Sequence, residues 1–271
     1  MAGVLFVNPR SGAADPSVEE LAAAARARDV QVQVLRDGDD PGELARAVDA
    51  DVLGMAGGDG SLGAVADAAV ERGLPFVAVP FGTRNHFARD LGLDRDDPLA
   101  ALAAFDGEAR QVDVGRVGDR LFLNNVSLGL YARLVHRRER HRRRSEALAR
   151  LRALAVLARH PRPLDLTVDG ERVTARVLLV ANNAYRLDAL SPGERERLDE
   201  GLLHLYASSG ILRDGWRERS ATRFVVDARR HRLRAAVDGE PAAFETPLEL
   251  RVEPGALRVL VPPGIAAEDA A

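Results

Sequence analysis

The chain has 271 residues, a formal net charge of −3 and no cysteine. A chain without cysteine excludes disulfides, Cys-ligated zinc and a thiol nucleophile. All 38 basic residues are arginine, which excludes a Walker A loop, a protein kinase core and Schiff-base chemistry, because each of these needs a lysine.

The sequence shows neither a secretion signal nor a membrane-spanning segment. The N-terminal stretch MAGVLFVNPRSG has no basic region and no long apolar run, and nowhere do 18 apolar residues follow one another. We therefore expect a cytoplasmic protein that associates with a membrane only peripherally.

The first hundred residues alternate between strand-like and helix-like segments. Ser17 and Glu20 have the spacing of a capping box at the start of the first helix. We predict strands at 4–7, 30–35, 51–56 and 75–80, and helices at 17–28, 41–49, 61–73, 84–93 and 97–105. Strand–helix alternation with short loops predicts an α/β layer around a parallel sheet.

The pattern changes near residue 112. Residues 112–130 read as two strands around a turn at Gly118-Asp119, and residues 164–183 as a hairpin that turns at Asp169-Gly170. Further strand-sized segments follow, interrupted only by a long helical stretch at about 129–160. The fold class predicted is therefore α/β plus mainly β, with a second, antiparallel domain.

Three of the predicted parallel strands end in glycine turns with small polar residues. The turns are NPRSG (8–12), AGGDGS (56–61) and PFGTRN (80–85). We expect all three at one edge of the sheet, where ligands of open α/β sheets bind. Their glycines would let the backbone approach a phosphate and adopt positive φ, and Ser61 would cap the next helix, whose free N–H groups favour an anion.

The aspartate in the second turn needs a separate explanation. Asp59 beside a phosphate is unfavourable unless a cation or a proton-transfer role accompanies it. The alternative at this position is a buried structural acid.

Seven motifs in order along the chain resemble the diacylglycerol kinase-like lipid kinases, a family that includes the sphingosine kinases. The matching segments are NPRSG (8–12), GGDGSLGAV (57–65), PFGTRNHFARDLGL (80–93), VDVGRV (112–117), FLNNVSLGL (122–130), LDEGLLHLY (198–206) and VDGE (237–240). GGDG alone also occurs in other kinases, but its combination with PxGTxN and a late DGE is specific.

The resemblance implies a two-domain enzyme with its active-site cleft between the domains. An α/β domain, residues 1–112, would bind ATP, and the chain end, 256–271, would return to it. A β-sandwich domain, residues 113–255 with a basic helical insertion at about 129–160, would bind the lipid. The family transfers the ATP γ-phosphoryl group to a lipid hydroxyl and uses Mg²⁺.

Family roles carry over to individual positions. Asp113 matches an acid near the acceptor hydroxyl, Asp238 a general base, and Glu240 a contact to Mg²⁺ or nucleotide. In some members the GGDG aspartate, here Asp59, is instead the base or a metal contact, and the sequence does not decide between the two. The predicted nucleotide-binding residues are Asn8, Gly57, Gly58, Gly60, Ser61, Gly82, Thr83, Asn85 and Glu240.

Two of the departures from the family pattern concern metal binding. His86 stands where an aspartate is common, and a neutral imidazole does not replace a carboxylate in a metal network. The DDG motif linked to a structural metal appears as Asp199-Glu200-Gly201, which leaves Glu200 as a doubtful ligand for a structural Mg²⁺.

The segment 131–161 contains a dense basic run. The arginines that we select from it as candidate lipid contacts are Arg137, Arg138, Arg142, Arg143 and Arg144. We expect contact with anionic phospholipid headgroups, to which each basic residue near the surface contributes roughly 1 kcal/mol; the alternative is a solvated charged helix. No aromatic residues are interleaved with the arginines, so binding to nucleic acid is not expected.

The leading hypothesis from the sequence is a lipid kinase that acts at a membrane surface. Two alternatives stay open: an NAD kinase-like enzyme, which shares GGDG, and a non-catalytic nucleotide or lipid sensor. The sequence names neither the lipid nor the oligomeric state.

Overall fold

The structure is a computed structural model of the chain. It describes residues 2–11, 16–82, 84–129, 164–188, 191–192, 194–208, 216–229 and 231–265. The chain forms two compact units. Unit 1 comprises Met1–Val114, Glu196–Asp199 and Pro254–Ala271, and unit 2 comprises Gly115–Arg195 and Glu200–Glu253. The predicted basic insertion at 129–160, apart from residue 129, lies outside the described residues.

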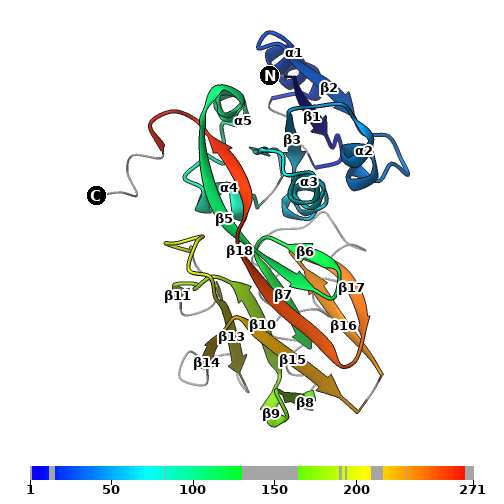
Figure 1. The fold of residues 1–271 in the computed structure, drawn as a ribbon, viewed down its shortest axis with the longest axis vertical. Helices are drawn as coiled ribbons and strands as arrows, with labels where there is room; N and C mark the ends of the chain where they lie inside the picture. The colour runs from blue at the N-terminus through cyan, green and yellow to red at the C-terminus, as the bar shows by residue number, and fades with distance from the viewer. Residues whose placement is uncertain are drawn as a thin grey trace. The chain divides into compact units, whose positions relative to one another are not determined.

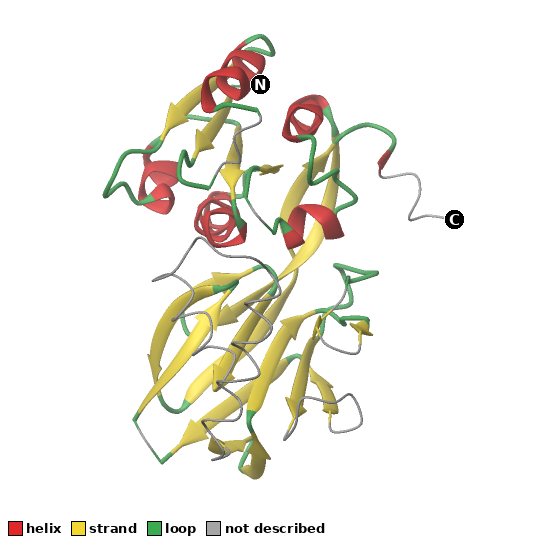
Figure 2. Cartoon of the chain, turned by 180° about the vertical axis from the view of Figure 1, so that it is seen from behind, coloured by secondary structure: helices red, strands yellow, loops and turns green. Residues whose placement is uncertain are grey.

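Unit 1 alternates strands and helices along the chain (Figures 1 and 2). Its strands are β1 (Gly3–Val7), β2 (Val30–Val34), β3 (Val52–Gly57), β4 (Phe76–Pro80), the first part of β5 (Glu108–Val117) and the last part of β18 (Leu248–Val261). Its helices are α1 (Val18–Arg26), α2 (Pro41–Ala47), α3 (Asp59–Arg72), α4 (His86–Asp90), α5 (Pro98–Ala101) and the 3₁₀ helix η1 (Leu102–Asp106).

The sheet of unit 1 has the strand order β2-β1-β3-β4, and each neighbouring pair is parallel. β18 continues it, because Val259 pairs in parallel with Phe76 of β4. This arrangement confirms the predicted α/β class. β1 lies between β2 and β3, so the chain leaves it toward one side and returns on the other. This is the topological switch point at which ligands of open α/β sheets bind.

Local sequence explains where the helices begin. The capping box at α1 is confirmed: Ser17 accepts from the Glu20 N–H at 3.1 Å, and the Glu20 carboxylate accepts from the Ser17 N–H at 2.8 Å. The hydrogen bonds with Ser17 lower the pKa of Glu20. Asp40 caps α2, which has Pro41 in its first turn. The single helix predicted at 97–105 is instead the short α5 followed by η1.

The core of unit 1 lies against the parallel strands. Buried residues of β1 (Leu5, Val7) pack with Leu21 of α1 and with Leu102 and Phe105 of η1. Strands buried along their whole length read as continuous apolar runs, which is why β1, β3 and β4 are recognisable from sequence.

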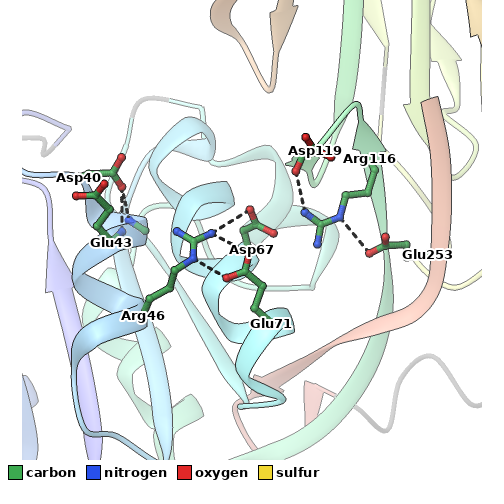
Figure 3. Close-up of polar contacts among 9 residues, drawn as sticks. Asp40, Glu43, Arg46, Asp67, Glu71, Arg116, Asp119 and Glu253 are labelled. Atoms are coloured by element: carbon green, nitrogen blue, oxygen red, sulfur yellow. Dashed lines mark hydrogen bonds and ion pairs between the residues drawn. The ribbon is translucent and has the colours of Figure 1, made fainter. Parts of the chain in front are cut away.

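An ion-pair network joins α2 to α3 on the surface of unit 1 (Figure 3). Arg46 of α2 forms ion pairs with Glu71 at 2.5 Å and Asp67 at 3.4 Å, both on α3. The hydrogen bond to Glu71 is the main reason why the pKa of Arg46 is raised. Since the Arg46 side chain is 41% exposed, we expect the network to add no more than about 1 kcal/mol to stability.

The described residues of unit 2 form strands and loops. The strands are the end of β5, β6 (Arg120–Phe122), β7 (Asn125–Gly129), β8 (Leu164–Val168), β9 (Glu171–Ala175), β10 (Val177–Asn182), β11 (Leu187–Asp188), β12 (Ser191–Pro192), β13 (Leu203–Ser208), β14 (Trp216–Ala221), β15 (Arg223–Ala228), β16 (Arg232–Val237), β17 (Glu240–Glu245) and the first part of β18.

These strands form two antiparallel layers around one core. One sheet has the order β14-β13-β10-β7-β16-β17, and in the other β15 pairs with β18 and β8. Alternate residues of both sheets, such as Val126, Val180, Leu205 and Phe224, point into the shared core. The predicted antiparallel domain is thus confirmed as a fold.

One predicted hairpin is only partly right. Residues 164–175 do turn at Asp169-Gly170, where both residues have positive φ. After Arg176 the chain leaves that sheet, and β10 pairs with β7 and β13 instead. The strand-like pattern of 164–183 therefore conceals a change of sheet after Arg176.

Candidate active site

The three glycine turns of unit 1 lie at one edge of its sheet. Val7 at the end of β1 pairs with Ala56 of β3, and Gly57 at the end of β3 pairs with Pro80 at the end of β4. The turns that follow these strands are therefore neighbours, as expected from the sequence. This common edge, next to the switch point at β1, is the candidate nucleotide site.

The first turn is tied to the second by a side-chain hydrogen bond. Asn8 donates from Nδ2 to the Ser61 hydroxyl at 2.9 Å and accepts at Oδ1 from the Arg10 N–H at 3.0 Å. Its own N–H donates to the Ala56 carbonyl at 2.9 Å. Asn8 thus fixes the start of the β1 turn against the start of α3.

Helix α3 begins two residues earlier than predicted. Its N-cap is Gly58, with φ −83° and ψ 171°, and no side chain caps it. The expectation that Ser61 caps this helix is therefore wrong, because Ser61 is already inside the first turn and its N–H donates to the Gly58 carbonyl at 2.9 Å. The N–H groups of Asp59 and Gly60 precede the helical hydrogen bonds, and such groups at a helix start favour an anion.

In the second and third turns, glycine is required at Gly82 because of close approach, and the positive φ predicted for these glycines is wrong. Gly57, Gly58, Gly60 and Gly82 are all outside the positive-φ region. A Cβ on Gly82 would lie 2.6 Å from the Gly58 Cα and 3.0 Å from the Gly58 nitrogen. A Cβ on Gly58 would meet only the Gly82 Cα, at 4.0 Å. The second and third turns thus pack backbone to backbone, and Gly82 is the residue without room for a side chain.

Asn85 uses its side chain on its own turn. Its Oδ1 accepts from the Gly82 N–H and its Nδ2 donates to the Gly82 carbonyl, both at 2.9 Å. The residue is 3% exposed and has φ 48°, a conformation that asparagine tolerates better than most residues. Asn85 therefore holds Gly82 in place against Gly58. Thr83 lies outside the described residues, so its predicted role stays a prediction.

Asp59 binds the start of helix α4. One carboxylate oxygen accepts from the Phe87 N–H at 3.0 Å and the other from the His86 N–H at 3.2 Å. The residue is 8% exposed. Asp59 is therefore a buried acid with an evident structural role, which joins the second turn to the helix that follows the third.

His86, where the family often has an aspartate, lies beside this carboxylate. Burial lowers the pKa of His86, and the nearby Arg89 and Arg84 lower it further, although the negative charge of Asp59 opposes the shift. The imidazole is therefore favoured in its neutral form near neutral pH.

Asp113 is buried near the end of the unit 1 part of β5. Its Oδ1 accepts from the Gly255 N–H at 2.8 Å, and its N–H donates to the Leu198 carbonyl at 2.7 Å. It is 2% exposed. These contacts hold two distant segments of the chain, so Asp113 contributes to the architecture of unit 1 whatever its part in chemistry.

Asp238 occupies the hairpin turn between β16 and β17 in unit 2. Asp238 and Gly239 are a two-residue loop with φ 48° and 83°, the geometry of a type I′ turn. The half-buried carboxylate accepts at one oxygen from the Asn124 and Asn125 N–H groups, at 2.8 and 3.0 Å, and at the other from the Leu123 N–H, at 2.8 Å. Glu240, at the end of the same turn, is exposed.

Glu200 is surrounded by partners other than a metal. Its Oε2 accepts from the Ala184 N–H at 2.9 Å and lies 3.0 Å from His204 Nε2. The other ring nitrogen of His204 is 3.0 Å from Glu218. No role for His204 is predicted from the sequence. The residue lies in the LDEGLLHLY motif, two positions before Tyr206, and alternate residues of a strand share one face of the sheet. Within the described residues no cluster of three or more His, Asp or Glu could hold a metal ion.

The predicted lipid-facing arginines cannot be placed. Arg137, Arg138, Arg142, Arg143 and Arg144 lie outside the described residues. Among the residues that the structure does describe, no helix has the length and apolar character needed to cross a bilayer.

Comparisons with known proteins agree with this architecture. A solved structure of a diacylglycerol kinase from Bacillus anthracis str. Sterne superposes over 97% of this chain and 98% of its own, with a TM-score of 0.68 and 17% identity. At that identity the likeness shows the fold alone.

Sequence relatives match over shorter stretches. A probable lipid kinase YegS-like of Pseudomonas aeruginosa PAO1 is 37% identical over 139 residues, 49% of this chain and 46% of its own. The diacylglycerol kinase of Bacillus subtilis 168 is 36% identical over 89 residues, 32% of this chain and 29% of its own. The matched region spans less than half the length of these curated relatives.

The family comparison covers the part of the chain that contains all three glycine turns. The diacylglycerol kinase catalytic domain matches residues 2–117, and this range also includes Asp59 and Asp113. Residues 2–117 are therefore similar to the diacylglycerol kinase catalytic domain, over a little less than half of the chain.

Proposed function

We propose that the chain is a lipid kinase that transfers the ATP γ-phosphoryl group to a hydroxyl of a membrane lipid, such as diacylglycerol or a sphingoid-type alcohol. The observation that supports this most is the backbone contact of Gly58 with Gly82 at the carboxyl edge of the parallel sheet. This contact brings the main chain of two turns together inside the region that matches the kinase family.

ATP would bind at the three turns of unit 1. Phosphoryl transfer depends mainly on positioning and charge neutralisation. Because the chain has no lysine, the phosphates would be held by backbone N–H groups at Gly57, Gly58 and Gly60 and by the start of α3. Gly82, whose N–H donates to Asn85, would instead keep the third turn close to the second. Asn8, Ser61, Thr83 and Asn85 would shape this edge, and Glu240 would contribute a nucleotide contact.

Mg²⁺ would neutralise the triphosphate charge when bound. The oxygens of Asp59 and Glu240 are the kind of donor that Mg²⁺ prefers, and this ion commonly takes one or two carboxylates together with substrate phosphates. That fits a chain whose described residues contain no preformed cluster of metal ligands. Glu200 fits a metal ligand less well than Asp59 and Glu240 do, because one of its carboxylate oxygens already binds the Ala184 N–H and His204.

Two acids would act on the lipid hydroxyl. We propose Asp238 as the general base, because its carboxylate is only half-buried and is oriented by three N–H groups. Asp113 would assist near the acceptor, and Asp59 would contribute through the metal. Arg137, Arg138, Arg142, Arg143 and Arg144 would attract anionic phospholipids at the membrane surface.

A lipid panel tests the proposal. Purified protein is incubated with Mg²⁺ and γ-labelled ATP in mixed micelles that contain diacylglycerol, sphingosine or a long-chain isoprenoid alcohol, and labelled lipid is extracted. We expect transfer to at least one lipid and none to NAD. Label on NAD alone would establish the NAD kinase-like alternative, and ATP binding without any transfer would establish the sensor.

A further inference from the structure

The bend at Leu123–Asn125 is held from two sides. Its N–H groups donate to Asp238, as described above. On the carbonyl side, Arg195 donates from Nη1 to the Leu123 carbonyl at 2.7 Å and from Nη2 to the Asn124 Oδ1 at 2.6 Å. An anion and a cation therefore bind opposite sides of the same short segment.

One peptide group lies directly between the two charges. The group that joins Leu123 to Asn124 accepts from Arg195 at its oxygen and donates to Asp238 at its nitrogen. Hydrogen bonds that share a peptide group polarise one another, so each strengthens the other. The position of the Asp238 carboxylate thus depends on where the guanidinium holds this peptide.

Arg195 is itself fixed in place. It is 3% exposed, and its Nη1 also donates to the Asn182 carbonyl at 3.0 Å. The guanidinium carbon lies 5.6 Å from the centre of the Tyr185 ring, within the range of a cation–π interaction. The Tyr185 hydroxyl in turn accepts from Asn125 Nδ2 at 3.0 Å, which ties the same ring to the bend.

We propose that Arg195 is a positioning residue for Asp238. Its planar fork holds the bend through two neighbouring acceptors, and the bend orients the carboxylate through three N–H groups. A lysine keeps the charge but has no fork, so it cannot hold both acceptors in one geometry. The effect on turnover rests on the proposed function, in which Asp238 is the base, whereas the structural coupling between Arg195 and Asp238 does not.

The chain offers a matched control in the same unit. Arg116 is 9% exposed and donates to a carboxylate and to a backbone carbonyl, namely Glu253 Oε2 and the Asp119 oxygen, both at 3.1 Å (Figure 3). Arg116→Lys therefore also removes a buried guanidinium from unit 2. The partners of Arg116, Glu253 and Asp119, lie outside the Leu123–Asn125 bend.

The test combines amide NMR with kinetics on the full chain. Arg195→Lys should move the amide resonances of Leu123, Asn124 and Asn125, and Arg116→Lys should leave them in place. With MgATP and the lipid that gives turnover, Arg195→Lys should lower kcat roughly 10- to 100-fold, the scale of a small misplacement of a reacting group. The KM for ATP should stay within about twofold. The dispersed NMR spectrum shows whether the variant folds.

A double-mutant comparison separates positioning from a general structural role. In an Asp238→Asn background, Arg195→Lys should cost less than about twofold in kcat, because the group it positions is already lost. An equal fold-loss in both backgrounds, or unchanged amide resonances at 123–125, would overturn the proposal. If the parent chain transfers no phosphoryl group to any lipid, the proposed function fails, and the amide resonances alone still decide whether Arg195 orients the bend.

Discussion

Two motif aspartates, one in each unit, use their carboxylates in similar ways on different scaffolds. Asp59 in unit 1 accepts from two N–H groups at the start of α4 and is 8% exposed. Asp238 in unit 2 accepts from three N–H groups of the Leu123–Asn125 bend and is half-buried. Both acids therefore join segments that are distant in the sequence.

The difference between them indicates which acid is better suited to be the base. Asp59 is nearly enclosed, and its oxygens complete a helix start, so its loss should first affect the architecture of the nucleotide edge. Asp238 projects from a tight hairpin turn and keeps more solvent access. We therefore assign proton transfer to Asp238 and support of the third turn to Asp59, and four predictions test this assignment.

The largest effect is expected from Asp238→Asn. The amide keeps the shape of the carboxylate but cannot take a proton, so turnover should fall roughly 10²–10⁴-fold, the usual scale of general-base loss. Nucleotide affinity, measured by calorimetry with MgATP, should be largely kept. A fully active variant would show that another group is the base, and Asp238 would then no longer differ from Asp59 in its proposed role.

The second prediction concerns Asp59→Ala, which leaves the His86 and Phe87 N–H groups without their acceptor. Because the Phe87 bond is buried, the free energy of unfolding should fall by about 1–3 kcal/mol. Urea denaturation measures this loss, and Asp59→Asn, which keeps one oxygen, is the control with a smaller loss. If Asp59→Ala is as stable as the parent chain, the carboxylate is not needed to hold α4.

The third prediction compares the two glycines of the nucleotide edge. Gly82→Ala should weaken MgATP binding by roughly tenfold or more, because its Cβ would lie 2.6 Å from the Gly58 Cα and the two turns must move apart. Gly58→Ala, whose Cβ meets only one atom at 4.0 Å, is the matched control and should bind MgATP more tightly than Gly82→Ala. The reverse order of affinities would show that the close approach of the turns does not matter for the nucleotide.

The smallest effect concerns the pH dependence of stability. Burial lowers the pKa of His86 below its ordinary value of 6.5, so in acid the unfolded chain binds a proton that the folded chain does not. The contribution of His86 to the free energy of unfolding is therefore complete above pH 6.5 and is lost as the pH falls below that value. His86→Gln should flatten the decline in unfolding free energy between about pH 7.5 and 5.5. The same decline in the variant and in the parent chain would contradict the lowered pKa of His86.

Much of unit 1 follows from local patterns. Continuous apolar runs, capping residues and short loops predict the parallel sheet, and parallel strands necessarily place their carboxyl-end turns at one edge. The start of α3 is different. Ser61 looks like a cap in the sequence, but the helix already begins at Asp59, because a glycine N-cap leaves no side-chain signal.

Local sequence patterns do not predict the hydrogen-bond partners of the polar residues. The carboxylate of Asp59 reaches residues 27 and 28 positions away, and that of Asp238 reaches residues 113 to 115 positions away. Arg195 stands in the unremarkable run ERER, and only the fold brings it to Leu123. Sequence therefore predicts which residue types are present at the site, whereas tertiary contacts determine what each one holds.

The most direct test of the account is a double-mutant cycle in the lipid kinase assay. Turnover is measured for the parent chain, Asp59→Asn, Asp238→Asn and the double variant, with the lipid that accepts phosphate. If both acids serve one phosphoryl-transfer step, the double variant should be about as slow as the slower single variant, because losses within one step are far from additive. Fold-losses that simply multiply would show that the two acids act independently, and would contradict the proposal that both take part in one phosphoryl-transfer step.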